Sequence, residues 1–295
     1  MRPFRRQAAR TLIRVVLAAS MLASGPLPAQ DRNNPDYVPK VGQEGKDVIW
    51  VPTPKALVER MLDMAHVTPD DYVIDLGSGD GRMVIAAAKR GARALGIEYN
   101  PEMVALARRN AEAAGVSDRA RFVQGDIFKT DFSEATVLTL YLLPSLNLKL
   151  RPTILKMKPG TRVVSHAFKM DDWLPDETAV VENRTAYLWI VPAAVAGTWQ
   201  LSTWKGQPAR DELVLRQRFQ FVEGLVRING KTGQVRDFRI NGPRVSFTVF
   251  EPTRGAPLRY GFAGRVSDNT MEGILKLPGG EREWLATRIS PPAAH

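Results

Sequence analysis

Short apolar runs alternate with helical patterns through the middle of the chain. Residues 72–76 (YVIDL) form an apolar run that predicts a strand, a glycine-rich turn follows, and the spacing of apolar positions in residues 82–90 predicts a helix. The alternation continues, with strands expected at 94–97, 121–123, 135–142 and 161–165 and helices at 100–115 and 146–156. Repeated strand–helix–strand units predict an α/β fold with a parallel, doubly wound sheet, in which ligands bind at the carboxyl ends of the strands.

The helical periodicity stops after Arg184, and short strands follow one another to the end of the chain. They are expected at 187–191, 198–203, 212–223, 225–228, 234–240, 245–250, 258–264, 271–277 and 283–288. Turn signals such as Asn229-Gly230 separate most of them, which is typical of antiparallel strands. We therefore expect residues 186–295 to form a small all-β domain, a barrel or a sandwich. The segment 197–199 (GTW) resembles the start of the first strand in lipocalin-like barrels.

The amino-terminal residues differ from the rest of the chain. Residues 1–14 carry five arginines and no acid, residues 15–24 (VVLAASMLAS) are apolar or small, and Ala29 suits the last position before a cleavage site. This order is typical of a secretory signal peptide, and the apolar run is shorter than the ~20 residues that a membrane span needs. We expect residues 1–30 to be a signal peptide and the protein to be exported to the periplasm. If the segment is not a working signal, the expected location is the cytoplasm.

Residues 31–47 are polar and rich in proline and glycine, which predicts a linker. Beyond it, apolar residues recur at helical spacing over residues 54–66, with Thr53 as the expected N-cap and Pro54 as the first helical residue. The first folded domain is therefore expected at residues 48–185.

The formal net charge is +10, and the sequence contains no cysteine. Without thiols the chain has no disulfide, no cysteine zinc ligand and no thiolate nucleophile, and its three dispersed histidines predict no metal site. Five of the positive charges lie in residues 1–30 and six in residues 186–295, whereas residues 31–185 carry a net charge of −1. This distribution does not favour a nucleic-acid partner.

The expected strand at 212–223 places basic residues on one face. Alternation puts Arg216 and Arg218 on the exposed side and Leu215 and Phe221 on the buried side. The arginines either form a solvated face or meet an acidic protein or an anionic lipid surface.

The strand ends of the middle segment bring candidate ligand-binding groups to one edge of the sheet. Gly77, Gly79 and Gly81 follow the first strand, where the absence of a Cβ lets the backbone approach a ligand. Glu98 ends the second strand, where a carboxylate can accept hydrogen bonds from both hydroxyls of a ribose. Asp126 follows the third strand, where it can accept from the amino group of an adenine.

Two further acids distinguish the kind of ligand. Asp75 lies at the end of the first strand, near the expected place of an ammonium group, and Asp80 lies inside the glycine turn. The turn has the spacing G-x-G-x-G, whereas the dinucleotide fingerprint is G-x-G-x-x-G. An acid in the turn repels a pyrophosphate and suits a cationic ligand, so a nicotinamide oxidoreductase is a disfavoured alternative.

Together these residues resemble the motifs of a known family. The segments 73–82 (VIDLGSGDGR), 96–98 (GIE) and 125–128 (GDIF) are similar to those of class I S-adenosylmethionine-dependent methyltransferases. The resemblance covers roughly residues 48–180 and implies a Rossmann-like sheet.

Three more segments are similar to lysine methyltransferases related to those that modify the ADP/ATP translocase and the c-subunit of ATP synthase. They are residues 50–54 (WVPTP), 139–144 (TLYLLP) and 163–166 (VVSH). The resemblance implies S-adenosyl-L-methionine as cofactor and protein-lysine N-methylation by direct in-line transfer. Its implied partner is a protein substrate, which includes a membrane protein or a protein at a membrane surface.

The resemblance and the strand-end positions indicate the site residues. The candidates for cofactor binding are Thr53, Asp75, Gly77, Gly79, Asp80, Glu98, Asp126 and Ile127. Tyr141 and His166 follow the fourth and fifth strands and are the candidate catalytic residues, Tyr141 facing a sulfonium and His166 touching the acceptor or relaying a proton. The structural alternatives are a core aromatic for Tyr141 and a hydrogen-bonded loop residue for His166. The alternative function is an exported, non-catalytic protein that binds an adenosyl compound or a ligand inside the barrel.

Overall fold

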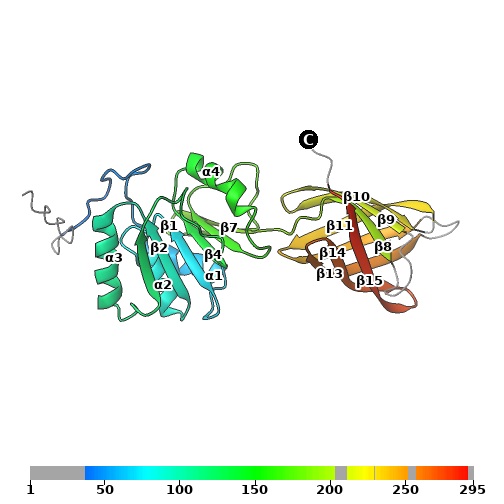
Figure 1. Ribbon diagram of the computed structural model, residues 1–295, viewed down its shortest axis with the longest axis horizontal. Coiled ribbons are helices and arrows are strands. Elements are labelled where there is room, and N and C mark those ends of the chain that lie inside the picture. Colours follow the sequence, from blue (N-terminus) through cyan, green and yellow to red (C-terminus); the bar gives the residue numbers. More distant parts are fainter. Residues whose placement is uncertain (1–36, 203–210, 229, 252–256, 292–295) are drawn as a thin grey trace, which may run out of the picture. The chain divides into compact units, whose positions relative to one another are not determined.

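The structure, a computed structural model, describes residues 37–202, 211–228, 230–251 and 257–291. The expected signal peptide at residues 1–30 lies outside the described residues. Figure 1 shows an α/β domain followed along the chain by an antiparallel barrel, which confirms the fold class predicted from the sequence. Within the described ranges, no helix has the length and apolar character that crossing a membrane requires.

A seven-stranded sheet with the order β3-β2-β1-β4-β5-β7-β6 forms the centre of the first domain. Its strands are β1 (Tyr72–Leu76), β2 (Arg93–Glu98), β3 (Ala120–Gln124), β4 (Val137–Leu140), β5 (Arg162–His166), β6 (Glu177–Val181) and β7 (Arg184–Ile190). The strands β1 to β5 run parallel, whereas β7 and β6 pair antiparallel with their neighbours. The strand order reverses between β1 and β4, and in doubly wound sheets this is the point where a ligand crevice forms.

Helices cover both faces of this sheet (Figure 1). They are α1 (Lys55–Met64), α2 (Arg82–Lys89), α3 (Pro101–Ala113) and α4 (Pro144–Ile154). The helices α1, α2 and α3 share one apolar core with Val73, whereas Ile154 of α4 belongs to a second core with Ile74. Because successive residues of a strand point to opposite faces, these two cores lie on opposite sides of β1.

The second domain is a closed barrel with the strand order β10-β11-β12-β13-β14-β15-β8-β9. Its strands are β8 (Gly197–Ser202), β9 (Asp211–Arg218), β10 (Phe221–Ile228), β11 (Lys231–Asn241), β12 (Arg244–Glu251), β13 (Leu258–Ser267), β14 (Thr270–Leu277) and β15 (Gly280–Ser290). Trp199, Phe247, Phe262 and Trp284 are buried and fill the interior. The guanidinium of Arg288 lies 4.1 Å from the centroid of the Trp199 ring, which links the last strand of the barrel to the first.

Two strand assignments made from the sequence are corrected by the structure. The strand expected at 187–191 as the first of the barrel is β7, which pairs with β5, so the expected domain boundary after residue 185 falls inside β7. The single strand expected at 212–223 is two strands, β9 and β10, joined by a turn in which Phe219 has a φ of 55°. The apolar alternation continues across this turn, which contains no glycine, proline or asparagine.

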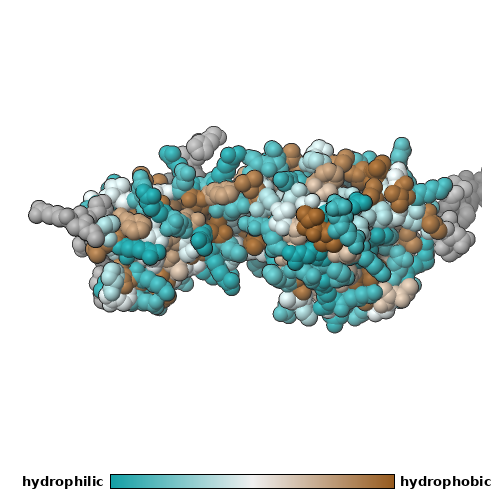
Figure 2. All heavy atoms as spheres, turned by 180° about the vertical axis from the view of Figure 1, so that it is seen from behind, coloured by the Kyte–Doolittle hydropathy of each residue, from teal (hydrophilic) through white to brown (hydrophobic). Residues whose placement is uncertain are grey.

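Hydrophilic side chains cover most of the face that Figure 2 shows, with apolar residues between them. On β9, Arg216 and Arg218 are exposed and Leu215 is buried, as the alternation predicts. The same alternation predicts Phe221 on the buried side, but its side chain is 52% exposed, because the turn at Phe219 ends the alternation of β9.

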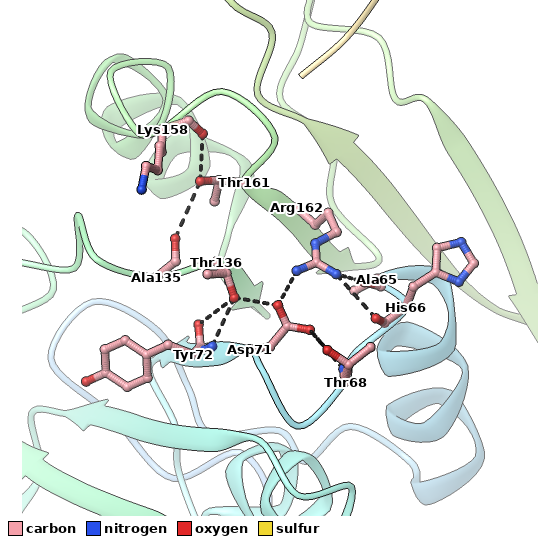
Figure 3. A network of polar contacts seen from close by, with 10 residues as sticks. All are labelled: Ala65, His66, Thr68, Asp71, Tyr72, Ala135, Thr136, Lys158, Thr161 and Arg162. Atoms are coloured by element: carbon pink, nitrogen blue, oxygen red, sulfur yellow. Dashed lines mark hydrogen bonds and ion pairs between the residues drawn. The ribbon is translucent and has the colours of Figure 1, made fainter. Parts of the chain in front are cut away.

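A polar network around Asp71 connects the amino-terminal ends of β1, β4 and β5 (Figure 3). Arg162 donates to the carboxylate of Asp71 and to the carbonyl of Ala65. The hydroxyl of Thr136 donates to the same carboxylate over 2.7 Å, and the amide of Thr68 over 2.8 Å. Burial raises the pKa of Asp71, but the hydrogen bonds from Thr136, Thr68 and Arg162 outweigh it and hold the pKa below its ordinary value. The network lies at the edge opposite the carboxyl ends of the strands and stabilises the sheet.

Candidate functional site

A pocket of about 680 Å³ lies at the carboxyl ends of β1, β2, β3 and β4. Its volume is in the range of ~300–1,000 Å³ that is typical of small-molecule sites. Nine of the residues proposed from the sequence line it: Thr53, Asp75, Gly77, Gly79, Asp80, Glu98, Asp126, Ile127 and Tyr141. The structure thus brings these residues together, whereas His166 lies outside the lining.

The glycine turn between β1 and α2 lines one side of the pocket. Gly77 and Gly79 have φ values of 82° and 54°, a conformation that side chains with a Cβ rarely adopt. A Cβ on Gly79 would lie 2.7 Å from Nε1 of Trp50, so the indole packs directly on the turn. Any larger residue at position 79 would displace this indole or the backbone.

Asp75 presents a buried carboxyl group to the pocket. It is 8% exposed and accepts a hydrogen bond from the hydroxyl of Thr139 over 2.6 Å. Burial, together with the charges of Glu98 and Asp80, raises the pKa of Asp75 to about 7, although the bond from Thr139 acts in the opposite direction. No cation pairs with Asp75 in the described part of the chain, and a cationic ligand group would stabilise its charged form.

The carboxylate of Glu98 is fixed by two backbone amides. One oxygen accepts from the amide of Gly79 and the other from the amide of Asn100, both over 2.9 Å. Each carboxylate oxygen can accept a further hydrogen bond, so the group is oriented and still able to bind hydroxyls of a ligand.

The residues expected as a linker take part in the pocket. Residues 42–50, here called the strap, form a short hairpin in which the amide of Gly42 donates to the carbonyl of Trp50 and the amide of Trp50 to the carbonyl of Gln43, both over 2.9 Å. Residues 43–50 all line the pocket. The expectation of a linker at 31–47 is therefore wrong for the strap, because its backbone pairing and the packing of Trp50 on Gly79 give it a defined place.

Lys46 of the strap contacts the residue expected to recognise an adenine. Its ammonium lies 2.8 Å from one carboxylate oxygen of Asp126, and the other oxygen accepts from the amide of Phe128 over 2.9 Å. Lys46 also lies 5.0 Å from the centroid of the Tyr99 ring. The hydrogen bonds from Lys46 and Phe128 lower the pKa of Asp126 below its ordinary value. Sequence reasoning missed Lys46, because nothing local links it to a residue 80 positions away.

Thr53 does not cap α1, contrary to the expectation from the sequence. The N-cap is Pro54, and no side chain caps the helix. The hydroxyl of Thr53 instead lies 3.1 Å from Nδ1 of His166, and its carbonyl accepts from Nη1 of Arg82 over 2.9 Å. The residue before a proline is confined to extended backbone, and in this conformation the hydroxyl meets the end of β5.

Asp80 lines the pocket, but Arg82 occupies its carboxylate. Nε and Nη2 of Arg82 donate to it over 3.0 and 2.5 Å. Asp80 is therefore half of an ion pair and does not present a free acid to a ligand, contrary to the prediction from the glycine spacing. No pattern in the sequence singles out Arg82, which is only the last letter of the glycine motif.

Tyr141, Phe168 and His166 form an aromatic group at the end of β4 and β5. The ring centroids of Tyr141 and His166 are 3.8 Å apart with an interplanar angle of 31°, and those of Tyr141 and Phe168 are 6.2 Å apart. His166 is fully buried, and among the described residues its Nε2 has no hydrogen-bond partner. Burial, helped by the charge of Arg184, lowers the pKa of His166 to about 4, so the ring is neutral at pH 7. Leu143 and Phe168 extend this end of the pocket as an apolar wall.

Comparison with protein families gives two partial matches. The model described as the ANTKMT methyltransferase domain matches residues 75–177, and a DNA methylase model matches residues 40–109. The first match covers β1 to the start of β6, and therefore the glycine turn and the strand ends that form the pocket.

Similar proteins include a protein-lysine N-methyltransferase of Saccharolobus islandicus (strain REY15A), which is 46% identical over 162 residues. The match covers 52% of this chain and 96% of that protein. The lysine N-methyltransferase of Mus musculus that is named for the ATP synthase c-subunit is 36% identical over 130 residues, and here the match covers 44% of this chain and only 52% of the mouse protein. Among solved structures, an RNA methyltransferase from Salinibacter ruber in complex with S-adenosyl-L-homocysteine is 54% identical, with 49% of this chain and 96% of that chain covered and a TM-score of 0.48.

Proposed function

This chain belongs to the family of S-adenosylmethionine-dependent methyltransferases that includes the Saccharolobus protein-lysine N-methyltransferase, and on this premise we propose that it methylates the side-chain amine of lysine in a protein. The observation that carries the proposal is the buried carboxyl of Asp75, which faces the pocket next to the glycine turn and lacks a cationic partner among the described residues. An enzyme that binds a cationic cofactor needs such a group at this place.

The residues of the pocket fit S-adenosylmethionine. Asp75 would hold the ammonium group of its methionine part, Glu98 the ribose hydroxyls, and Asp126 with Ile127 the adenine. Gly77 and Gly79 leave room for the backbone to approach the ligand. When bound, this cofactor supplies a methyl group activated by a sulfonium. The protein therefore needs to align donor and acceptor and to exclude water.

The apolar end of the pocket suits the acceptor. A lysine amine must be neutral to accept a methyl group, and removal of its charged form from water lowers its pKa. Tyr141, Leu143 and Phe168 line this end and offer no carboxylate that would stabilise an ammonium group. The ring or oxygen of Tyr141 can face the sulfonium, and direct in-line transfer then needs no covalent intermediate on the protein.

Transfer of tritium from S-adenosylmethionine tests the proposal. Purified protein is incubated with separate fractions of envelope proteins, cytoplasmic proteins and nucleic acids, and acid hydrolysis identifies the labelled residue. We expect label in methyllysine, with Asp75→Ala and Glu98→Ala losing both transfer and cofactor binding. Asp118→Ala serves as the matched control, because the Asp118 side chain is 72% exposed and does not line the pocket.

Other outcomes distinguish the alternatives. Cofactor binding without transfer to any fraction supports the non-catalytic binding protein, and absence of cofactor binding removes the enzyme. Label in nucleic acid rather than protein contradicts lysine as the acceptor. Label in membrane proteins of the envelope fraction supports the membrane substrate that the family resemblance implies.

We further propose that the protein is exported and acts in the periplasm. The support is the sequence of residues 1–30, with its basic start, its apolar run and the small Ala29. Mass spectrometry of the protein from fractionated cells measures the outcome. A periplasmic chain that begins at Gln30 agrees with the proposal, and an intact cytoplasmic chain contradicts it.

A further inference from the structure

Thr53 is held from two sides in the wall of the pocket. Its carbonyl accepts from Nη1 of Arg82 over 2.9 Å, and its hydroxyl lies 3.1 Å from Nδ1 of His166. Thr53 is buried and stands between Pro52 and Pro54. Proline fixes its own φ and confines the residue before it to extended backbone, so the segment is short and stiff. Its position therefore depends on these two contacts.

Arg82 connects this segment to the glycine turn. Its Nε and Nη2 donate to the carboxylate of Asp80, and the carbonyl of Asp80 accepts from the side-chain amide of Asn110 over 2.9 Å. A guanidinium is planar and rigid, so a two-point contact with a carboxylate also fixes the direction of its remaining nitrogen. Nη1, which holds the carbonyl of Thr53, is that nitrogen.

We infer that Arg82 is a positioning residue, which couples the turn that binds the methyl donor to the segment that walls the acceptor end of the pocket. The inference rests on the proposed function. Arg82 acts through Thr53: a shift of Thr53 moves His166, and the His166 ring lies against Tyr141. Donor and acceptor are thereby kept in register by one side chain that need not touch the reacting atoms.

The variant Arg82→Lys separates charge from geometry. Lysine keeps the positive charge beside Asp80, but its single ammonium cannot reproduce the fixed fork that serves Asp80 and Thr53 together. Arg90→Lys is the matched control. Nη2 of Arg90 donates to the carbonyl of Glu59 over 3.1 Å and Nη1 pairs with Asp63 over 2.7 Å, so this arginine also combines a carbonyl contact with an ion pair, away from the pocket lining.

Hydrogen–deuterium exchange of the full chain measures the coupling, with S-adenosylmethionine as the only addition. In the unsubstituted protein we expect the cofactor to slow exchange in the glycine turn (76–82) and in residues 51–58. In Arg82→Lys the turn should still respond and residues 51–58 should not, whereas Arg90→Lys should keep both responses. A preserved response of residues 51–58 in Arg82→Lys overturns the inference, and so does its loss in Arg90→Lys, which would indicate general loosening.

Kinetics provides the second measurement. With the fraction that accepts label, Arg82→Lys should lower the apparent kcat about tenfold or more, because a displacement of ~1 Å can cost up to ~10²-fold in rate. The dissociation constant of S-adenosylmethionine should change less than about threefold, since the lysine retains the charge beside Asp80. An equal fall in affinity and rate would make Arg82 a cofactor-binding residue and contradict the inference. If the unsubstituted protein binds the cofactor but transfers no label, the proposed function fails, and the exchange experiment still decides the coupling.

Discussion

The hydroxyl of Thr53 and Nδ1 of His166 lie 3.1 Å apart, although 113 positions separate them in the sequence. This contact joins the segment before α1 to the end of β5, next to the ring of Tyr141. Because His166 is buried and neutral, it brings no second positive charge near the expected sulfonium, which a cation would repel. His166 is better placed to position Thr53 and Tyr141 than to touch the acceptor.

A phenylalanine at position 166 tests this role. His166→Phe keeps a ring against Tyr141 but removes the partner of the Thr53 hydroxyl. We expect kcat for methyl transfer to fall about tenfold, the order of one lost hydrogen bond, with little change in cofactor affinity. Tritium transfer and calorimetry measure the two quantities. Complete loss of transfer with a displaced pH optimum would instead identify His166 as a proton relay.

Acid should destabilise the protein through His166. Its pKa is about 4 in the folded state and ~6.5 in an unfolded chain, so between these values the unfolded chain binds more protons. The free energy of unfolding therefore falls as the pH falls from about 6.5 to about 4. Urea unfolding at several pH values should show a smaller acid loss in His166→Phe than in the unsubstituted protein. Equal losses in the two proteins would mean that the imidazole is not held neutral.

Asp75 should reduce the stability of the ligand-free protein at neutral pH. Its pKa of about 7 in the folded state exceeds the ordinary value, so the folded state binds more protons and the free energy of unfolding falls as the pH rises from about 4 to about 7. At pH 8 we expect Asp75→Asn to gain on the order of a few kcal/mol in the free energy of unfolding and to bind S-adenosylmethionine at least about tenfold more weakly. Thermal unfolding and calorimetry give both results. A variant that is less stable and binds normally would refute the assignment of Asp75 to the ligand.

Lys46 should compete with the cofactor for Asp126. The ammonium of Lys46 holds one oxygen of the carboxylate that is expected to accept from the adenine amino group. Lys46→Met should therefore bind S-adenosylmethionine about two- to fivefold more tightly at low salt, with the difference shrinking at ~1 M salt. Lys40→Met, an exposed lysine before the strap, should leave the affinity unchanged. Weaker binding by Lys46→Met would show that the lysine contacts the cofactor itself.

The network around Asp71 should contribute to stability and not to binding. Asp71→Asn leaves Arg162 without its partner at a largely buried position, so we expect a loss of about 3 kcal/mol or more in the free energy of unfolding. The neighbouring Asp70 is exposed, and Asp70→Asn is the matched control. Urea unfolding measures stability, and calorimetry on the folded fraction should give an unchanged cofactor affinity. A stable Asp71→Asn variant would contradict the role given to the network.

Local sequence is sufficient for the features that depend on neighbouring residues. The strand YVIDL, the glycine turn after it and the Asn100-Pro101 helix start are set by hydrophobicity, missing side chains and capping within a few positions. Because parallel strands of one sheet end at the same edge, the order of Asp75, Glu98 and Asp126 along the chain is enough to predict that they line one pocket.

Features that depend on partners far away in the sequence are not predictable in this way. An apolar run shows that β7 is a strand but not which sheet it joins, and its place among other short strands favours the barrel wrongly. Thr53 has the chemistry of an N-cap, and only the fold shows that a buried imidazole is its partner. The roles of Lys46 and Arg82 likewise follow from contacts with Asp126 and Thr53, which no spacing rule connects to them.

The closure of the barrel limits how another polypeptide can dock on it. Because β8 pairs with both β9 and β15, every described barrel strand has two hydrogen-bonded neighbours, and none offers a free row of amides and carbonyls to an incoming chain. The sheet of the first domain, in contrast, ends on β3 and β6, each with one side unpaired among the described strands. An acceptor protein that binds by adding a strand can therefore do so only at β3 or β6, and any recognition by the barrel must come from its side chains or its loops.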